Sequence, residues 1–137
     1  MFLYEIKINY TRQTGEDNPQ GVNEIYFVEG FTVADVEERL LGEIQRYISG
    51  EWETKSCKQV QVYDYIAKPK ANTWYKGRVE LITIDEDKET RKAVNVYAQA
   101  DNITEATKAI HQLMGNNDFE VASVTRTKLV DIIRMVH

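Results

Sequence analysis

The stretch Ile66-Ala-Lys-Pro-Lys-Ala-Asn-Thr-Trp-Tyr-Lys-Gly-Arg78 joins two halves of the chain that show the same succession of sequence patterns. It also holds the one dense mixture of cations and aromatic residues in an otherwise acidic chain. The expected fold follows from the halves on either side of this stretch, and the candidate binding site follows from the stretch itself.

The first half contains two strand patterns, a helix pattern and a third strand pattern. Apolar and polar residues alternate over Tyr4–Tyr10, which predicts a strand with one buried face. Turn-forming residues in Thr11–Gly21 predict a long hairpin loop before a second strand at Asn23–Glu29. Apolar residues spaced by three and four predict a helix over Thr32–Gly50, and Trp52–Tyr65 returns to a strand pattern.

The second half repeats this order. Trp74–Ile84 has a strand pattern and Asp85–Lys92 has the composition of a charged turn. Ala93–Ala100 is a second strand, Asn102–Asn117 is a helix that ends at a glycine, and Phe119–Ile133 is the closing strand.

The helix starts of the two halves are also alike. Thr32 is followed three residues later by Asp35, and Asn102 is followed three residues later by Glu105. Both pairs resemble the capping box that begins many helices.

These patterns predict an α+β fold of two tandem ββαβ repeats, with residues 1–67 as the first unit and residues 68–137 as the second. Each unit is expected to form an antiparallel sheet covered by one helix, within one compact pseudo-symmetric domain. The ordered matches between the halves, such as Asp64-Tyr-Ile with Asp131-Ile-Ile, favour an internal duplication. The alternative is that any two such units share capping residues and alternation.

Composition narrows the classes of function. The 137 residues carry a formal charge of −5 and are 42% apolar, which is typical of a folded soluble domain. The negative charge argues against binding to duplex DNA or to a membrane surface. Cys57 is the one cysteine, and the N-terminal residues have charges where a signal peptide needs an apolar run. We therefore expect a cytoplasmic protein.

Several stretches resemble a known family. They are YFVEGFTVADVEER at Tyr26–Arg39, YISGE at Tyr47–Glu51, WYK at Trp74–Lys76 and ITIDE at Ile82–Glu86. Together they resemble an uncharacterised domain-of-unknown-function family of Bacteroidetes bacteria and their phages and prophages. The resemblance spans almost the whole chain and carries no activity, cofactor or catalytic residue. It implies an accessory protein of a phage or mobile element in the bacterial cytoplasm. Gly77 departs from the family, where an apolar residue is usual, and predicts a bulge or a close approach of the backbone.

No motif in the sequence indicates catalysis, a metal site or a cofactor. The histidines His111 and His137 lack a second ligand at metal-binding spacing. Cys57 has no neighbouring base that would favour its thiolate. The acidic run that begins at Asp85 lacks the central glycine of a calcium loop. We expect a protein that is not an enzyme, with no catalytic residue, no metal and no cofactor.

The remaining constellation lies around the joining stretch. Cations neutralise phosphate and aromatic faces stack on bases, so their mixture predicts binding of a nucleotide-like ligand. The candidate residues are Lys68, Lys70, Trp74, Tyr75, Lys76, Arg78, Tyr63 and Tyr65. The alternative is that Trp74 and Tyr75 belong to the core and that the lysines are merely solvated.

Three functions fit these observations. The favoured one is a non-enzymatic module that sequesters an anionic nucleotide, such as an immune signalling nucleotide. The second is a module that binds a host or phage protein through a sheet face or through the acidic helix. The third is binding of single-stranded nucleic acid in phage replication. A homodimer is compatible with all three, because exposed sheet edges invite pairing.

Overall fold

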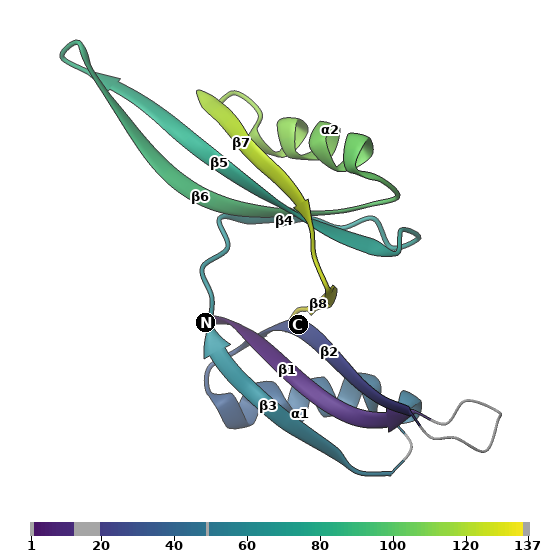
Figure 1. The fold of residues 1–137 in the computed structure, drawn as a ribbon. Coiled ribbons are helices and arrows are strands. Elements are labelled where there is room, and N and C mark those ends of the chain that lie inside the picture. Colours follow the sequence, from purple (N-terminus) through teal and green to yellow (C-terminus); the bar gives the residue numbers. More distant parts are fainter. Residues whose placement is uncertain (1, 13–19, 49, 136–137) are drawn as a thin grey trace. The chain divides into compact units, whose positions relative to one another are not determined.

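The computed structural model describes residues 2–12, 20–48 and 50–135 (Figure 1). These described residues form two compact units, one made of those up to residue 60 together with 129–135 and the other of residues 61–128. The described elements are, in chain order, β1 (Phe2–Arg12), β2 (Gln20–Gly30), α1 (Val33–Ile44), a short 3-10 turn (Gln45–Tyr47), β3 (Trp52–Gln59), β4 (Asp64–Ile66), β5 (Thr73–Asp85), β6 (Lys88–Ala100), α2 (Ile103–Met114), β7 (Phe119–Arg126) and β8 (Leu129–Ile133). The expectation of an α+β fold is confirmed.

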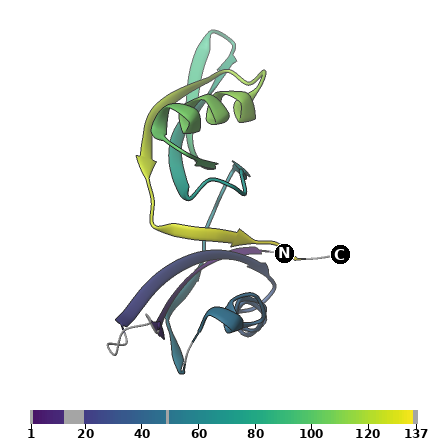
Figure 2. The same ribbon diagram turned by 90° about the vertical axis from the view of Figure 1, so that its right-hand side faces the viewer.

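The two units have the same strand order. Sheet A of the first unit has the order β3-β1-β2-β8, and sheet B of the second has the order β7-β5-β6-β4 when it is followed from the corresponding edge. In each sheet the first three strands are antiparallel and the fourth is parallel to its neighbour. One helix covers one face of each sheet, as Figure 2 shows for α2 on sheet B.

The fourth strand of each sheet comes from the other half of the sequence. β4 follows β3 in the chain but pairs with β6, and β8 follows β7 but pairs with β2. The register of this fourth strand is also the same in both sheets. Asp64 pairs with Val96 and Asp131 pairs with Tyr26, and both partners, Val96 and Tyr26, precede the N-cap of the following helix by six residues. Each of these aspartates accepts a hydrogen bond from the next backbone N–H at 2.8 Å. The two sheets therefore share their strand order and the register of the fourth strand, and the internal duplication stays a prediction.

The prediction of one closing strand per half was wrong. Trp52–Tyr65 breaks into β3 and β4, and Phe119–Ile133 breaks into β7 and β8, with the two pieces in different sheets. Consequently each sheet has four strands, and the compact units do not coincide with the sequence halves 1–67 and 68–137. Neither break contains a glycine or proline, and apolar alternation continues through the first one at Val60 and Val62. The sequence therefore lacked a turn signal where the chain leaves one sheet.

Both helices begin at the residues that the sequence indicates. The Thr32 side chain accepts a hydrogen bond from the Asp35 N–H at 3.1 Å, and the Asn102 side chain accepts one from the Glu105 N–H at 2.9 Å. The capping residues satisfy backbone donors that a first helical turn leaves without partners. α2 ends at Gly115, whose φ of 58° is in the left-handed region that glycine favours.

Each helix closes a separate apolar core. In the first unit Val36, Leu40 and Ile44 of α1 pack on alternate residues of β1 and β2. In the second unit Ala106, Ile110 and Met114 of α2 pack on Tyr75, Val79 and alternate residues of β6. Residues in a strand alternate between faces, and among the described elements of each unit no helix packs on the opposite face of its sheet.

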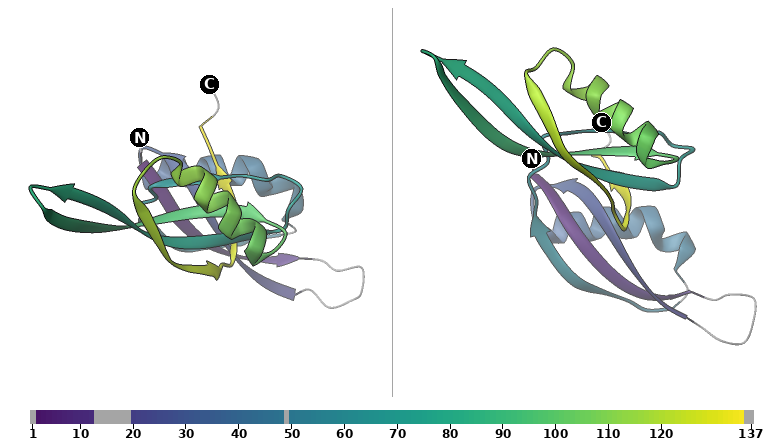
Figure 3. Two further views of the ribbon diagram at one scale, coloured as in Figure 1. Left: turned by 90° about the horizontal axis from the view of Figure 1, so that it is seen from above. Right: turned by 45° about the horizontal axis from the view of Figure 1, so that its top comes forward.

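The hairpin of β5 and β6 extends beyond the rest of sheet B, as Figure 3 shows. β7 pairs with β5 only from Tyr75 to Leu81, whereas β6 pairs with it as far as Asp85 and Lys88. The predicted charged turn over Asp85–Lys92 is therefore wrong, because the turn itself is Glu86 and Asp87, both with positive φ. Such a two-residue turn suits the twist of the hairpin strands, and it lets pairing continue almost to the tip.

Candidate functional site

The predicted aromatic pair Trp74–Tyr75 is buried and does not form an exposed stacking platform. Tyr75 is 8% exposed and belongs to the core under α2. Trp74 is 1% exposed, lies on the other face of β5 and meets the Tyr65 ring edge-on at a centroid distance of 6.3 Å. Its indole N–H is buried without a hydrogen-bond partner among the described residues. For these two side chains the core interpretation of the sequence holds.

Lys68 and Lys70 lie apart from the other predicted cations, in the segment between β4 and β5. The Lys68 amine forms an ion pair of 2.9 Å with Asp101, and its backbone N–H donates to the Gln99 side chain. The hydrogen bond to Asp101 raises the pKa of Lys68. The positive charge of Lys68 is therefore already paired with a carboxylate. Lys70 is an exposed residue of the following turn.

Lys76 and Arg78 lie next to each other on the helix-free face of β5. Lys76 is directly opposite Tyr97 of β6 and Thr125 of β7, and Arg78 is directly opposite Asn95 and Ser123. Tyr65 continues the first of these rows on β4, because it pairs with Tyr97. We call Lys76, Arg78, Asn95, Ser123 and Thr125 the basic face.

The nearby carboxylates do not neutralise the basic face. Glu80 and Glu120 lie beside it, and both bind the Arg91 guanidinium, at 2.9 and 2.7 Å. The hydrogen bonds that Arg91 donates to Glu120 first, and then to Glu80 and Glu89, raise the pKa of Arg91 further above its ordinary value. Among the described residues, neither Lys76 nor Arg78 has a carboxylate within ion-pairing distance. Two positive charges therefore lie among neutral hydrogen-bonding side chains.

Arg78, Ser123 and Thr125 are exposed, and Lys76 and Asn95 are half-buried. A lysine, an arginine, an amide and two hydroxyls can donate several hydrogen bonds to one anionic group. Arg78 can bind a phosphate through two parallel N–H donors, whereas Lys76 provides a point charge. The arrangement fits a phosphate or carboxylate ligand. The neighbouring Tyr97 is buried, whereas Tyr65 is half-buried and is of the residue type that stacks on planar rings.

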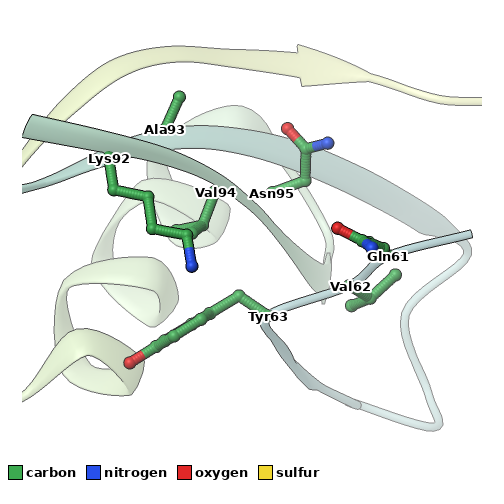
Figure 4. Close-up of a pocket in the computed structure, with 7 residues that line it drawn as sticks. All are labelled: Gln61, Val62, Tyr63, Lys92, Ala93, Val94 and Asn95. Atoms are coloured by element: carbon green, nitrogen blue, oxygen red, sulfur yellow. The ribbon is translucent and has the colours of Figure 1, made fainter.

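Tyr63 lies in a separate groove at the edge of sheet B. The groove has a volume of about 370 Å³ and is lined by Gln61–Tyr63 and Lys92–Asn95. Figure 4 shows Lys92 extending from β6 toward the Tyr63 ring, while Ala93 points away from it. The Tyr63 side chain is 50% exposed, and Lys92 is the one charged residue of the lining. We call this hollow the β6 groove.

A second hollow of about 320 Å³ lies over the other end of β6, beside α2. Its lining mixes cations with a carboxylate, since Lys68 and Lys108 are accompanied by Glu105. The Lys68 amine is bound to Asp101, so this hollow offers less to an anion than the basic face does.

The described residues provide no arrangement typical of catalysis. No group of three or more His, Cys, Asp or Glu side chains among them could hold a metal ion. Cys57 is half-buried, and burial, with a smaller contribution from Glu37, raises the pKa of its thiol and disfavours the reactive thiolate. His111 is exposed beside the Phe119 ring, and His137 lies outside the described residues.

Comparison with known proteins places the chain in a family. A family model described as a domain of unknown function, DUF4494, matches residues 2–135. The chain belongs to this family. No curated protein and no solved structure matches it. In the described part of the chain, no helix combines the length and the apolar character that crossing a membrane requires.

Sequence reasoning found Lys76 and Arg78 but missed four residues that lie close to the predicted site residues. Asn95, Ser123 and Thr125 lie beside those cations only through strand pairing, and Lys92 faces Tyr63 only through the return of the chain to β6. The alternation of residues along β5 shows that Lys76, Arg78 and Trp74 share a face, and this was the sequence feature that pointed to the basic face. The partners on β6 and β7 depend on a register that the sequence does not specify.

Proposed function

We propose that the chain is a non-enzymatic binding module that holds an anionic, nucleotide-type ligand on the basic face. The observation that carries this proposal is the pair of cations Lys76 and Arg78, which lie among neutral donors while Arg91 occupies the adjacent carboxylates. A phosphate would contact both cations, and a base or ribose would lie toward the half-buried Tyr65. An immune signalling nucleotide is one member of this ligand class.

The cellular setting is a further part of the proposal. We propose that the protein is an accessory protein of a phage or mobile element and acts in the bacterial cytoplasm by sequestering its ligand. This setting is what the resemblance of the sequence to a family of Bacteroidetes bacteria and their phages implies. Sequestration requires tight binding without turnover, so the ligand should be recovered unchanged from the complex.

The test is titration calorimetry with ATP, ADP-ribose and cyclic di-AMP, with adenosine as the uncharged comparison. At least one phosphorylated compound should bind and adenosine should not. The Lys76→Ala/Arg78→Ala double variant should bind it at least about a hundredfold more weakly, because each charge-assisted hydrogen bond contributes roughly 1.5–3 kcal/mol. A Lys108→Ala/Lys128→Ala variant loses the same charge at exposed lysines outside the basic face and should bind normally.

Two results would contradict the proposal. One is equal weakening by both double variants, which would indicate a general charge effect. The other is binding of a single-stranded oligonucleotide with a steep salt dependence and no binding of mononucleotides, because several phosphate contacts release several counterions. That outcome would favour nucleic-acid binding instead.

A protein-interaction module is the second candidate. The observation that favours it is the open edge of β6 beside the β6 groove, where backbone groups are available to another chain.

A further inference from the structure

β6 is paired along its whole length on one side only. On the β5 side pairing runs from Lys88 to Ala100, whereas on the other side β4 pairs only with Val96, Tyr97 and Ala98. One further contact continues this edge, a hydrogen bond of 2.9 Å from the Tyr63 N–H to the Asn95 carbonyl. From Lys88 to Val94 no described strand covers the outer edge.

The outward backbone groups of this edge can be assigned. In an antiparallel pair, successive residues direct their N–H and C=O groups alternately toward and away from the partner strand. The Asn95 carbonyl receives its bond from Tyr63 and so points away from β5. The backbone N–H and C=O groups of Ala93 and Arg91, two and four residues earlier, therefore also point away from β5. Both residues are exposed.

The β6 groove lies along this edge. Between Gln61 and Tyr63 the chain runs beside β6 without strand pairing and leaves a space of about 370 Å³. On the face that carries Lys92 and Val94, the groove is bordered by the Tyr63 ring (Figure 4). Its lining contains one ammonium and no carboxylate, in a chain whose formal charge is −5.

We propose that the β6 groove binds an extended acidic peptide segment of a partner protein as an additional strand on β6. The peptide backbone would pair with Ala93 and Arg91, which is the mode of recognition known as strand addition. In an antiparallel arrangement, an apolar residue would lie opposite Val94 and a carboxylate two residues later would lie opposite Lys92. The motif is therefore an apolar residue, any residue, and then Asp or Glu.

The experiment is an amide NMR titration of the full chain with the acetylated and amidated hexapeptide VTETVT. The counterpart VTKTVT carries a lysine in place of the glutamate. VTETVT should shift the amides of Arg91, Ala93 and Tyr63, and VTKTVT should bind about tenfold more weakly or not at all, a difference that corresponds to about 1.4 kcal/mol. Absence of shifts at these amides at millimolar peptide would overturn the proposal.

Charge-reversal variants test the role of Lys92. Lys92→Glu should reverse the preference, so that VTKTVT becomes the better ligand. Lys88→Glu makes the same charge change on the same strand outside the groove and should leave the preference unchanged. An unaltered preference in Lys92→Glu, or a reversed one in Lys88→Glu, would contradict the assignment.

Backbone pairing is tested from both sides. Ala93→Pro removes an N–H that points away from β5, a strand position where proline is tolerated, and should abolish binding. VTETVT that is N-methylated at its second residue loses the N–H that would donate to Ala93, and it should not bind the unaltered protein. Equal binding of the methylated and unmethylated peptides would exclude strand addition, whatever effect Ala93→Pro has on folding.

Discussion

Gly77 shows how one residue sets the distance between α2 and sheet B. A Cβ atom at this position would lie 2.6 Å from the Ile110 Cδ1 and 3.0 Å from the Val96 Cγ2, both inside ordinary contact distance. The close approach of the backbone that the sequence indicates is confirmed. The register shift between β5 and β7 also occurs nearby, between Arg78 and Val79.

We predict that Gly77→Ala lowers the free energy of unfolding by about 1–3 kcal/mol, because the added methyl group overpacks the core. Ile110→Val removes the atom nearest to that methyl group and by itself costs roughly 0.5–1.5 kcal/mol. The double variant should cost less than the sum of the two single changes, since the two residues are in contact. Chemical unfolding of the four proteins measures this coupling, and additive costs would show that the contact does not limit the packing.

At the same scale, the sequence could not separate the environments of Trp74 and Tyr75. Alternation places them on opposite faces of β5, but a cation-rich neighbourhood suggested that both were exposed. Both rings are buried, whereas Lys76 and Arg78 on the same strand keep part of their side chains exposed. The alternation of a strand decides on which face a residue lies, whereas the burial of that residue depends on what packs against the face.

The elements were predicted best where local chemistry determines them. The N-caps Thr32 and Asn102 follow from side chains that compete for backbone donors within one turn. The exchange of β4 and β8 between sheets could not be predicted, because it depends on pairing between residues that are distant in the sequence. The same limit hid the neighbours of Lys76 and Arg78 on β6 and β7.

The start of α1 should make the stability of the first unit depend on pH. The Phe31 N–H donates to the Asp35 carboxylate at 3.0 Å, and this hydrogen bond first, then Arg39, lowers the pKa of Asp35 below 3.8. The unfolded chain therefore takes up a proton at Asp35 more readily than the folded chain. The stabilisation is complete above the unfolded pKa and is lost as the pH falls through the lower folded value.

We predict that Asp35→Asn destabilises the protein at pH 6 and that the cost shrinks at pH 3, because the unfolded wild-type chain then binds a proton at Asp35. Thr32→Ala removes the cap that does not titrate and should cost about 1 kcal/mol at both pH values. Urea unfolding followed by circular dichroism compares the three proteins. An Asp35→Asn cost that is the same at pH 6 and pH 3 would show that the hydrogen bond with Phe31 does not favour the charged form.

Across the whole molecule, the charge is divided unevenly between the two units. Residues 61–128 contain ten Lys or Arg and ten Asp or Glu, so the net charge of −5 comes entirely from residues 1–60 and 129–137. The overall charge therefore does not describe the unit that carries the basic face. An anion that reaches this unit meets no net negative charge, and the two cations of the basic face are not paired with carboxylates of the described residues.

The most direct test of the binding proposal is native mass spectrometry of the protein purified from phage-infected or prophage-induced bacterial cells. We predict a bound small molecule that is lost on denaturation and has the mass of a nucleotide. It should be missing from the Lys76→Ala/Arg78→Ala variant. Protein that carries no small molecule, or a ligand that the double variant retains, would contradict a nucleotide site on the basic face.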